Sequence, residues 1–291
     1  MKPAPFDYHA PATLDEAVAL LTRLGDEGCD VKIIAGGQSL MPMLALRVAR
    51  PEVLVDLGRL EALDYIRDEG GTLVIGAMAS KQAAADSDLV RRAQPLFQAA
   101  TELVGHRQIR NRGTVGGSFA HADPASEYPA VALVLDTEFE AVGPDGMRTI
   151  PAADFFVTYM TTSLEANEVL TAVKFAPFAP RRRWAIQEFA RRNGDLALAG
   201  VAVTLDIEAG LCRDVRIAAF GVQATAVRLT AAERMLEGRP AQPQHFEEAG
   251  RVAATALDDP MGCIHASPDY RRHLVGVLAA RALTEAAARP Q

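Results

Sequence analysis

The sequence predicts an α+β protein made of two domains, and three observations support this. Short runs with strand or helix periodicity alternate through the first part of the chain. A Pro- and Arg-rich segment at 175–183, FAPFAPRRR, interrupts them. Beyond it, three strand-like runs precede Ala- and Leu-rich helical runs. We therefore expect a first domain over residues 1–175, itself divided into parts of about 1–57 and 58–175, and a second domain over 176–291.

The first domain opens with a small α/β unit. Thr13-Leu-Asp-Glu16 matches a capping box before an apolar periodic run, and Gly25 ends that run, so a helix is predicted between them. A strand over 31–35, a short helix over 40–47 and a strand over 53–56 follow.

The later elements are predicted in the same way, from the periodicity of the apolar residues, the length of each run and the turn residues at its ends. In the first domain we predict a hairpin of 63–67 with 72–75, helix over 80–104 interrupted near Pro95, extended loop over 113–125, helix over 128–135, paired strands at 137–142 and 147–150, and a strand over 169–175. In the second we predict strands at 184–190, 197–207 and 215–221, then helices over about 227–237, 244–256 and 269–287. The second domain should thus be a three-stranded antiparallel sheet packed on helices.

Composition narrows the class of protein. The 291 residues suit about two domains, and an apolar share of 49% is enough for a sizeable core. The net charge of −7, the absence of a basic block and the single Trp argue against nucleic-acid binding. No apolar run approaches the roughly 20 residues of a membrane span, and the N-terminus lacks the apolar stretch of a signal peptide. We expect a cytoplasmic protein without a membrane span.

The cysteines and other ligand-type residues predict no metal centre on this chain. Cys29, Cys212 and Cys263 are isolated, which disfavours a disulfide framework, and an iron–sulfur cluster usually takes four cysteine ligands. The pair His121 and Asp123 could ligate a metal, but no further ligands cluster nearby. No acid–base side chain stands out as catalytic either.

Two Gly-Gly turns carry the strongest signal: VKIIAGGQSLMPML at 31–44 and GTVGGSFAHADPA at 113–125. Consecutive glycines can expose consecutive backbone N–H groups, which bind anions, and a following helix adds roughly half a positive charge. Such a turn suits a phosphate or pyrophosphate. Neither turn is a P-loop, a Rossmann fingerprint or a nucleophile elbow. For each turn alone, a tight turn without a ligand remains an open alternative.

Together, AGGQSL and GTVGGSFAHADPA resemble the FAD-binding (medium) subunit of the molybdenum hydroxylases, of the carbon monoxide dehydrogenase type and related to the xanthine dehydrogenase flavin domain. The resemblance extends over the whole chain through Gln108-Ile-Arg-Asn111, Thr161-Thr-Ser-Leu164, Glu168-Val-Leu170 and Arg191-Arg-Asn-Gly-Asp195. It implies a two-part FAD-binding domain of the PCMH or vanillyl-alcohol oxidase type, followed by the C-terminal domain of the carbon monoxide dehydrogenase flavoprotein.

By this resemblance both turns bracket the FAD pyrophosphate. The implied cofactor-binding residues are Ile34, Ala35, Gly36, Gly37, Gln38, Ser39 and Leu40 from the first turn, Thr114, Val115, Gly116, Gly117, Ser118, Ala120 and Asp123 from the second, and Glu127, Leu170 and Glu188 beyond them. Glu127 stands where the family usually has Asp, at the ribose or adenine end. Gln187 and Glu188 stand where some members have Lys near the flavin ring, and the missing cation should make the flavin harder to reduce.

The implied function is electron transfer. A separate large subunit would bind molybdopterin and hydroxylate the substrate, a separate small subunit would carry 2Fe–2S clusters, and the FAD on this chain would pass electrons to an external acceptor. Two such trimers should pair, with partner contacts around 100–112 and 191–195. A stand-alone FAD oxidase of the vanillyl-alcohol type and a non-redox nucleotide-binding module remain as alternatives. The sequence identifies neither the substrate nor the acceptor.

Overall fold

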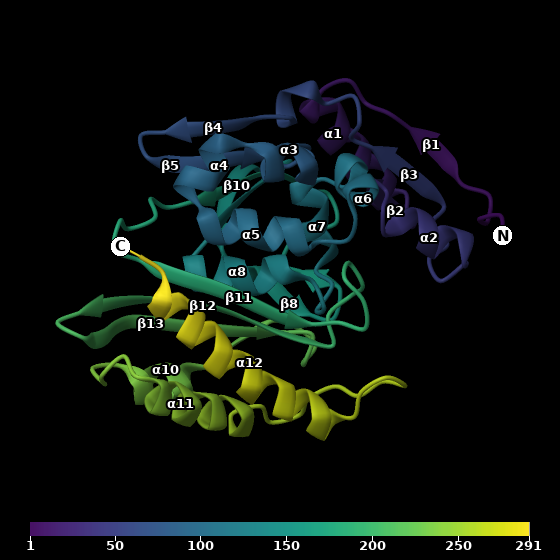
Figure 1. Ribbon diagram of the computed structural model, residues 1–291. Coiled ribbons are helices and arrows are strands. Elements are labelled where there is room, and N and C mark those ends of the chain that lie inside the picture. Colours follow the sequence, from purple (N-terminus) through teal and green to yellow (C-terminus); the bar gives the residue numbers. More distant parts are fainter. Residues whose placement is uncertain (291) are drawn as a thin grey trace.

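The computed structural model describes residues 1–290 and shows stacked layers of sheet and helix (Figure 1). A small parallel sheet lies at the N-terminal end. A five-stranded sheet, a layer of helices, a four-stranded sheet and a last layer of helices follow. The strands are β1 (Asp7–His9), β2 (Val31–Ile34), β3 (Val53–Asp56), β4 (Ile66–Glu69), β5 (Thr72–Gly76), β6 (Glu138–Gly143), β7 (Gly146–Pro151), β8 (Phe156–Thr158), β9 (Thr161–Thr162), β10 (Val169–Phe175), β11 (Arg183–Phe189), β12 (Ala199–Glu208), β13 (Leu211–Phe220) and β14 (Val227–Arg228).

Helices cover the sheets and connect them. They are α1 (Leu14–Asp26), α2 (Leu40–Ala45), η1 (Glu61–Leu63), α3 (Lys81–Asp86), α4 (Asp88–Ala93), α5 (Pro95–Leu103), α6 (Arg107–Arg112), α7 (Val115–His121), α8 (Glu127–Leu135), α9 (Ala152–Phe155), α10 (Thr230–Leu236), α11 (Pro243–Thr255) and α12 (Pro268–Ala288). None of them, within residues 1–290, combines the length and the apolar character needed to cross a bilayer.

The first domain holds two sheets. The first is parallel in the order β1-β3-β2, and α1 packs beside it. The capping box of α1 is confirmed, because the Thr13 hydroxyl accepts from the Glu16 N–H and the Glu16 carboxylate accepts from the Thr13 N–H. The second sheet is antiparallel in the order β4-β5-β10-β6-β7, and the predicted hairpins form its two edges.

The second domain packs onto the first through α8. This helix is buried on nearly every side, between the five-stranded sheet and strands β12 and β13. Ala202, Ala218 and Phe220 of those strands belong to the same apolar core as Phe97 and Phe119 of the first domain. Arg228 donates to the carbonyl of Leu133 near the C-terminus of α8, where a cation is favourable. The two domains therefore share one continuous core.

Several predictions about elements were wrong. The helix expected over 80–104 is divided at Ser87 as well as near Pro95. Residues 113–125 are not an extended loop, because they contain α7, with Thr114 as its N-cap. The sequence did not predict this helix because its two glycines lower helix propensity and its only apolar pair, Val115 and Phe119, is too short a pattern to outweigh them. In the structure both of these side chains are buried. The C-terminal sheet has a fourth strand, the two-residue β14, and the helix expected from 227 begins at Thr230.

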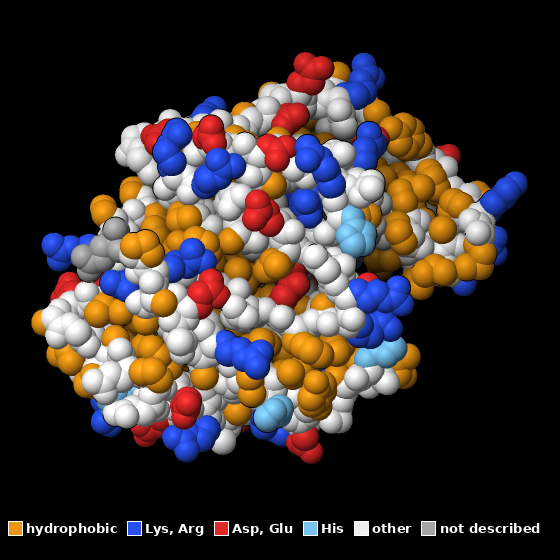
Figure 2. Space-filling view, viewed as in Figure 1, with side chains coloured by type: hydrophobic (Ala, Val, Ile, Leu, Met, Phe, Trp, Pro, Cys, Tyr) orange, Lys and Arg blue, Asp and Glu red, His pale blue; other side chains and the backbone are white. Residues whose placement is uncertain are grey.

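Apolar side chains are exposed on the N-terminal unit. Tyr8 of β1 and Met41, Leu46 and Val48 in and after α2 are 43–72% exposed. Figure 2 shows orange side chains gathered over this part of the molecule. Contiguous exposed apolar surface of this kind is typical of a protein–protein contact.

Candidate functional site

The fold brings the two Gly turns, some eighty residues apart in sequence, into direct contact. A Cβ placed on Gly36 would overlap the carbonyl oxygen of Arg112 and lie 2.8 Å from the Cα of Gly113. A Cβ on Gly117 would lie 3.4 Å from the Cβ of Ala35. The lack of a side chain at Gly36 therefore allows the two backbones to touch, and Gly117 lies beside Ala35 at ordinary contact distance.

The first turn presents a row of free backbone donors. Within residues 1–290, the N–H groups of Gly36, Gly37, Gln38 and Ser39 contact no hydrogen-bond acceptor. Gly37 has a φ of +70°, which L side chains rarely adopt. The Ser39 hydroxyl makes no capping bond to α2. Four unpaired N–H groups in sequence form a concavity suited to anion oxygens.

The N–H groups of the second turn donate to acceptors within the protein, whereas the sequence suggested that they would be free to bind an anion. Val115 and Gly116 donate to the carbonyls of Ala79 and Ala77, and Gly117 donates to the Thr114 hydroxyl. None of its glycines has a positive φ. A Cβ on Gly116 would lie 2.6 Å from the Cα of Ala77. These glycines therefore serve close packing, and the row of free donors belongs to the first turn.

Beyond the second turn lies a buried cluster of titratable groups. Glu127, the first residue of α8, is only 6% exposed, and burial raises its pKa to about 7; Glu188 raises it further and Lys81 opposes the shift. Burial likewise raises the pKa of Glu188 to about 7. Burial lowers the pKa of His121, which Asp123 opposes. The cluster thus joins α3, α7, α8 and β11.

Glu188 faces this cluster, but Gln187 does not. Neighbouring residues of a strand point to opposite faces, and Gln187 donates to Glu285 of α12. Glu188 lies on the face of β11 where Trp184 and Ile186 pack against the first domain. Its Oε2 atom is buried without a hydrogen-bond partner among the described residues. Only one residue of the predicted pair can therefore belong to a site in the first domain.

The other predicted residues lie in different surroundings. Thr114 caps α7 and Asp123 accepts from the Ala125 N–H, so both shape the second turn. Leu170 lies in the core on β10, against which α7 packs. Ala120 is exposed at the surface of α7. Ile34, Leu40 and Ser118 lie at the turns and are partly buried.

Sequence reasoning missed Lys81 and Tyr128. Lys81 begins α3, and its backbone N–H donates to the carbonyl of Gly113. Its side chain is 8% exposed, and its ammonium lies 5.4 Å from the centre of the buried Tyr128 ring. A weak signal was present, since lysine occurs only at 2, 32, 81 and 174. Nothing in the local pattern marks position 81 as buried.

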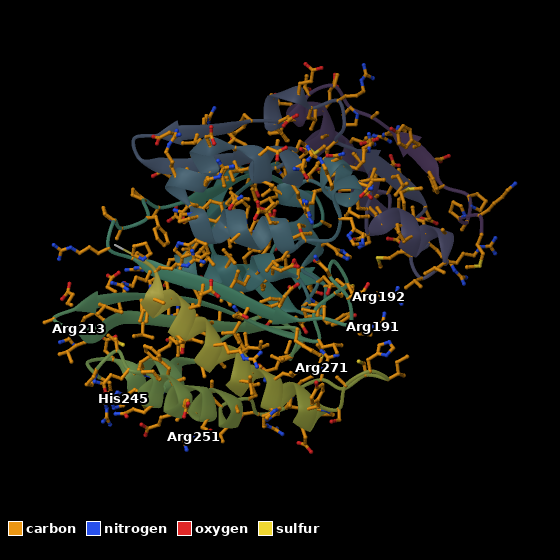
Figure 3. The ribbon with its side chains drawn as sticks, in the orientation of Figure 1. Arg191, Arg192, Arg213, His245, Arg251 and Arg271 are labelled. Atoms are coloured by element: carbon orange, nitrogen blue, oxygen red, sulfur yellow. The ribbon has the colours of Figure 1, made fainter. Side chains whose placement is uncertain are left out.

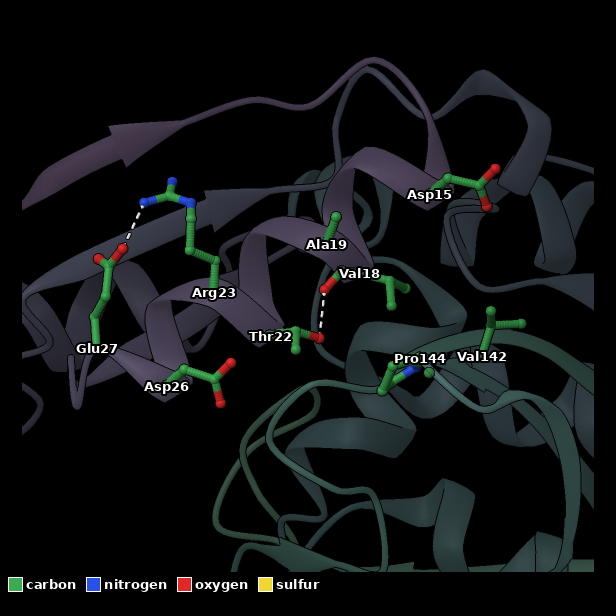
Figure 4. A pocket seen from close by; sticks show the side chains of 10 residues that line it. Asp15, Val18, Ala19, Thr22, Arg23, Asp26, Glu27, Val142 and Pro144 are labelled. Carbon is green, nitrogen blue, oxygen red and sulfur yellow. Dashed lines mark hydrogen bonds and ion pairs between the residues drawn. The ribbon is translucent and has the colours of Figure 1, made fainter.

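Two open hollows lie elsewhere on the surface. A groove of about 730 Å³ runs between α1 and the end of β6, and Figure 4 shows Asp15, Thr22, Arg23 and Pro144 on its walls. None of its lining residues belongs to either Gly turn. A polar hollow of about 490 Å³ brings residues 102–110 together with Asn193. Within residues 1–290, no group of three or more His, Cys, Asp or Glu side chains is arranged so that it could hold a metal ion.

Comparison with known families identifies this arrangement. The family described as the FAD binding domain in molybdopterin dehydrogenase matches residues 4–177. The chain belongs to this FAD-binding family. A second family, the CO dehydrogenase flavoprotein C-terminal domain, matches residues 184–286. The resemblance to the FAD-binding subunits of the molybdenum hydroxylases is confirmed, FAD is the cofactor of this chain, and the chain is an oxidoreductase subunit.

Relatives match the chain over its whole length. It is 40% identical to the carbon monoxide dehydrogenase medium chain of Hydrogenophaga pseudoflava over 99% of both chains. It is 41% identical to the nicotine 6-hydroxylase medium subunit of Paenarthrobacter nicotinovorans, over 99% of this chain and 100% of the relative. A solved structure of the H. pseudoflava carbon monoxide dehydrogenase, lacking the Mo-pyranopterin moiety, superposes with a TM-score of 0.94 over 98% of both chains.

The residues present fit FAD. The four free N–H groups of the first turn match the oxygens of a pyrophosphate, which accept hydrogen bonds but donate none. The Glu127 and Glu188 carboxyl groups offer acceptors for hydroxyl and N–H groups of a cofactor. The unpaired Glu188 oxygen is a buried group of the kind that a ligand completes.

Proposed function

We propose that the chain is the electron-transfer subunit of a heterotrimeric molybdenum hydroxylase. The observation that carries this is the row of free N–H groups at Gly36–Ser39 pressed against the second Gly turn. FAD supplies the redox chemistry, taking up electrons and passing them to an external acceptor. The chain's own residues bind the cofactor, orient it and enclose it.

The residue roles that we propose combine the geometry of the first turn with the family resemblance. The N–H groups of residues 36–39 donate to the pyrophosphate, and Ile34, Ala35 and Leu40 shape the turn around it. Thr114 to Ser118 hold the second turn close, with Ala120 and Asp123 extending it. We assign Glu127 to accept hydrogen bonds from the ribose or adenine end of FAD. We assign Leu170 to the surface beneath the cofactor and Glu188 to the surroundings of the flavin ring. Within the chain we assign the PCMH-type FAD-binding domain to 1–175 and the C-terminal domain to 176–291.

The partners proposed are a large molybdopterin-binding subunit and a small 2Fe–2S subunit, in a dimer of heterotrimers in the cytoplasm. Two features support partner contacts. The exposed apolar surface of β1 and α2 is one. The other is that the segments 100–112 and 191–195, far apart in sequence, meet: a Cβ on Gly194 would lie 2.7 Å from the Nδ1 of His106. Figure 3 places Arg191 and Arg192 at this end of β11, where blue side chains gather in Figure 2.

The relatives leave the substrate open. One is named for carbon monoxide and another for nicotine, at nearly equal identity to this chain. A subunit that carries FAD but not the molybdenum centre does not itself select the substrate. The substrate therefore follows from the large subunit with which this chain assembles.

Co-expression tests the assembly. The chain is produced with the candidate large and small subunits, and the product is separated by size exclusion and assayed for molybdenum, iron and flavin. We expect one complex with all three components, whereas the chain alone should bind FAD and hydroxylate nothing. A single chain free of molybdenum and iron that hydroxylates a substrate would refute the proposal.

A further inference from the structure

Lys81 is a buried lysine whose ammonium has no hydrogen-bond or ion-pair partner among the described residues. The residue is 8% exposed, and among residues 1–290 its ammonium makes no salt bridge within 4.0 Å and no hydrogen bond. It lies over the Tyr128 ring, 5.4 Å from the ring centre, which is within reach of a weak cation–π interaction. Burying an ammonium without a partner is costly, and burial lowers the pKa of Lys81 to about 8.

The side chain of Lys81 runs along the second Gly turn. Its backbone N–H donates to the Gly113 carbonyl at 2.8 Å. A Cβ on Gly113 would lie 3.7 Å from the Cδ of Lys81 and 3.7 Å from the Cγ of Gln38. The stem therefore passes the place where both turns meet. The ammonium end is close enough to Glu127 for each charge to act on the other.

The charge in this region is unbalanced. Lys81 acts electrostatically on Glu127 of α8 and on His121 of α7. Glu127 is in turn near the carboxyl groups of Glu188 on β11 and of Asp123, which follows α7. FAD brings two further negative charges with its pyrophosphate. Because like charges in a poorly solvated site repel strongly, a bound dinucleotide needs a nearby cation.

We propose that Lys81 is a cofactor-binding residue whose ammonium donates to an oxygen atom of FAD and offsets its negative charge. This inference rests on the proposed function and names a residue that neither Gly turn contains. It explains why the ammonium has no hydrogen-bond or ion-pair partner within the described residues, since that partner is the cofactor. It also places a cation in the cluster that holds Glu188.

The test compares Lys81→Met with Lys174→Met in the full chain, freed of flavin. Lys174 lies in the same domain, on β10, and pairs with Glu140 at 2.5 Å. The dissociation constant for FAD is measured by fluorescence titration at two salt concentrations, and the melting temperature of each flavin-free variant is recorded. We expect Lys81→Met to weaken FAD binding at least tenfold and reduce its salt dependence, without lowering the melting temperature. Lys174→Met should change the dissociation constant less than twofold.

The outcomes distinguish failure of the proposed function from failure of the proposed role of Lys81. Wild-type chain that takes up no FAD refutes the proposed function itself. Wild-type chain that binds FAD, with Lys81→Met within twofold of it, refutes only the role of Lys81. If the melting temperature of Lys81→Met is much lower than that of wild type, Lys81→Gln is used instead, because it keeps a polar end in a similar volume. A tenfold rise in its dissociation constant for FAD supports the proposal, and a value within twofold of wild type refutes it.

Discussion

Replacing Gly36 by Ala should drive the two Gly turns apart and abolish tight FAD binding. The new Cβ would lie 2.8 Å from the carbonyl carbon of Arg112 and from the Cα of Gly113, and closer still to the Arg112 oxygen. Carbon atoms in contact prefer about 3.5–4.0 Å. One backbone must therefore move by roughly 1 Å relative to the other. Such overpacking costs about 1–3 kcal/mol of folding stability.

The larger effect falls on the cofactor. A displacement of this size misaligns the free N–H donors of residues 36–39. A hydrogen bond to a charged group contributes about 1.5–3 kcal/mol. Loss of two such bonds weakens binding by about 3–6 kcal/mol, which is on the order of a 100-fold or greater rise in the dissociation constant. Titration of the flavin-free chain with FAD, followed by fluorescence, measures this directly.

Gly25→Ala is the matched control. Gly25 lies in α1 without a positive φ, and no heavy atom would lie within 4 Å of the new Cβ. It should leave FAD binding unchanged and stabilise the helix by about 0.5–1 kcal/mol. The reasoning fails if folded Gly36→Ala binds FAD within threefold of wild type.

Three further outcomes are expected. Glu127 has a folded-state pKa of about 7 against an ordinary 4.5, so the stability it contributes is fully present below pH 4.5 and is lost as pH rises to about 7. This pH-dependent contribution to the free energy of unfolding amounts to at most about 3 kcal/mol. Glu127→Gln should abolish it, as measured by urea titrations of the flavin-free chain at several pH values. A pH profile of stability unchanged from wild type would contradict the assignment. Gly117→Val would place its Cβ 2.6 Å from the Thr114 hydroxyl oxygen that caps α7 and its methyl groups against Ala35, so the purified variant should contain little FAD; flavin content equal to wild type would argue against a role of the second turn in binding. Arg228→Leu would leave the buried Glu233 without its bidentate partner, lowering stability by on the order of 3 kcal/mol while FAD affinity stays constant, and a shifted affinity would mean that the domain junction shapes the site.

Element type was predictable where a pattern is long or has clear boundaries. The capping box at Thr13, the strand at 169–175 and the helix over 269–287 all lie close to their predicted places. The helix α7 was not predictable, because its seven residues include two glycines and it is held by contacts with Ala77 and Ala79. The two-residue β14 is defined only by its pairing with β13. Tertiary contacts decide such short elements.

The candidate site was predictable at the turns and not beyond them. The two Gly-Gly turns led us to expect a shared anion site through the family that they resemble. They did not reveal that, among the described residues, a row of free N–H groups occurs in the first turn while Val115 and Gly116 donate to Ala79 and Ala77. The separation of Gln187 from Glu188 required the register of β11. Lys81 required the burial of its side chain, which no local pattern indicates.

The central claim is that the paired turns hold the pyrophosphate of FAD, and the most direct measurement identifies the flavin that the purified chain carries. The protein is denatured, and the released chromophore is separated from FMN and quantified per chain. The account predicts FAD at close to one molecule per chain, with uptake of FAD by chain that was stripped of flavin. Release of FMN alone, or a stripped chain that takes up no FAD, would contradict it.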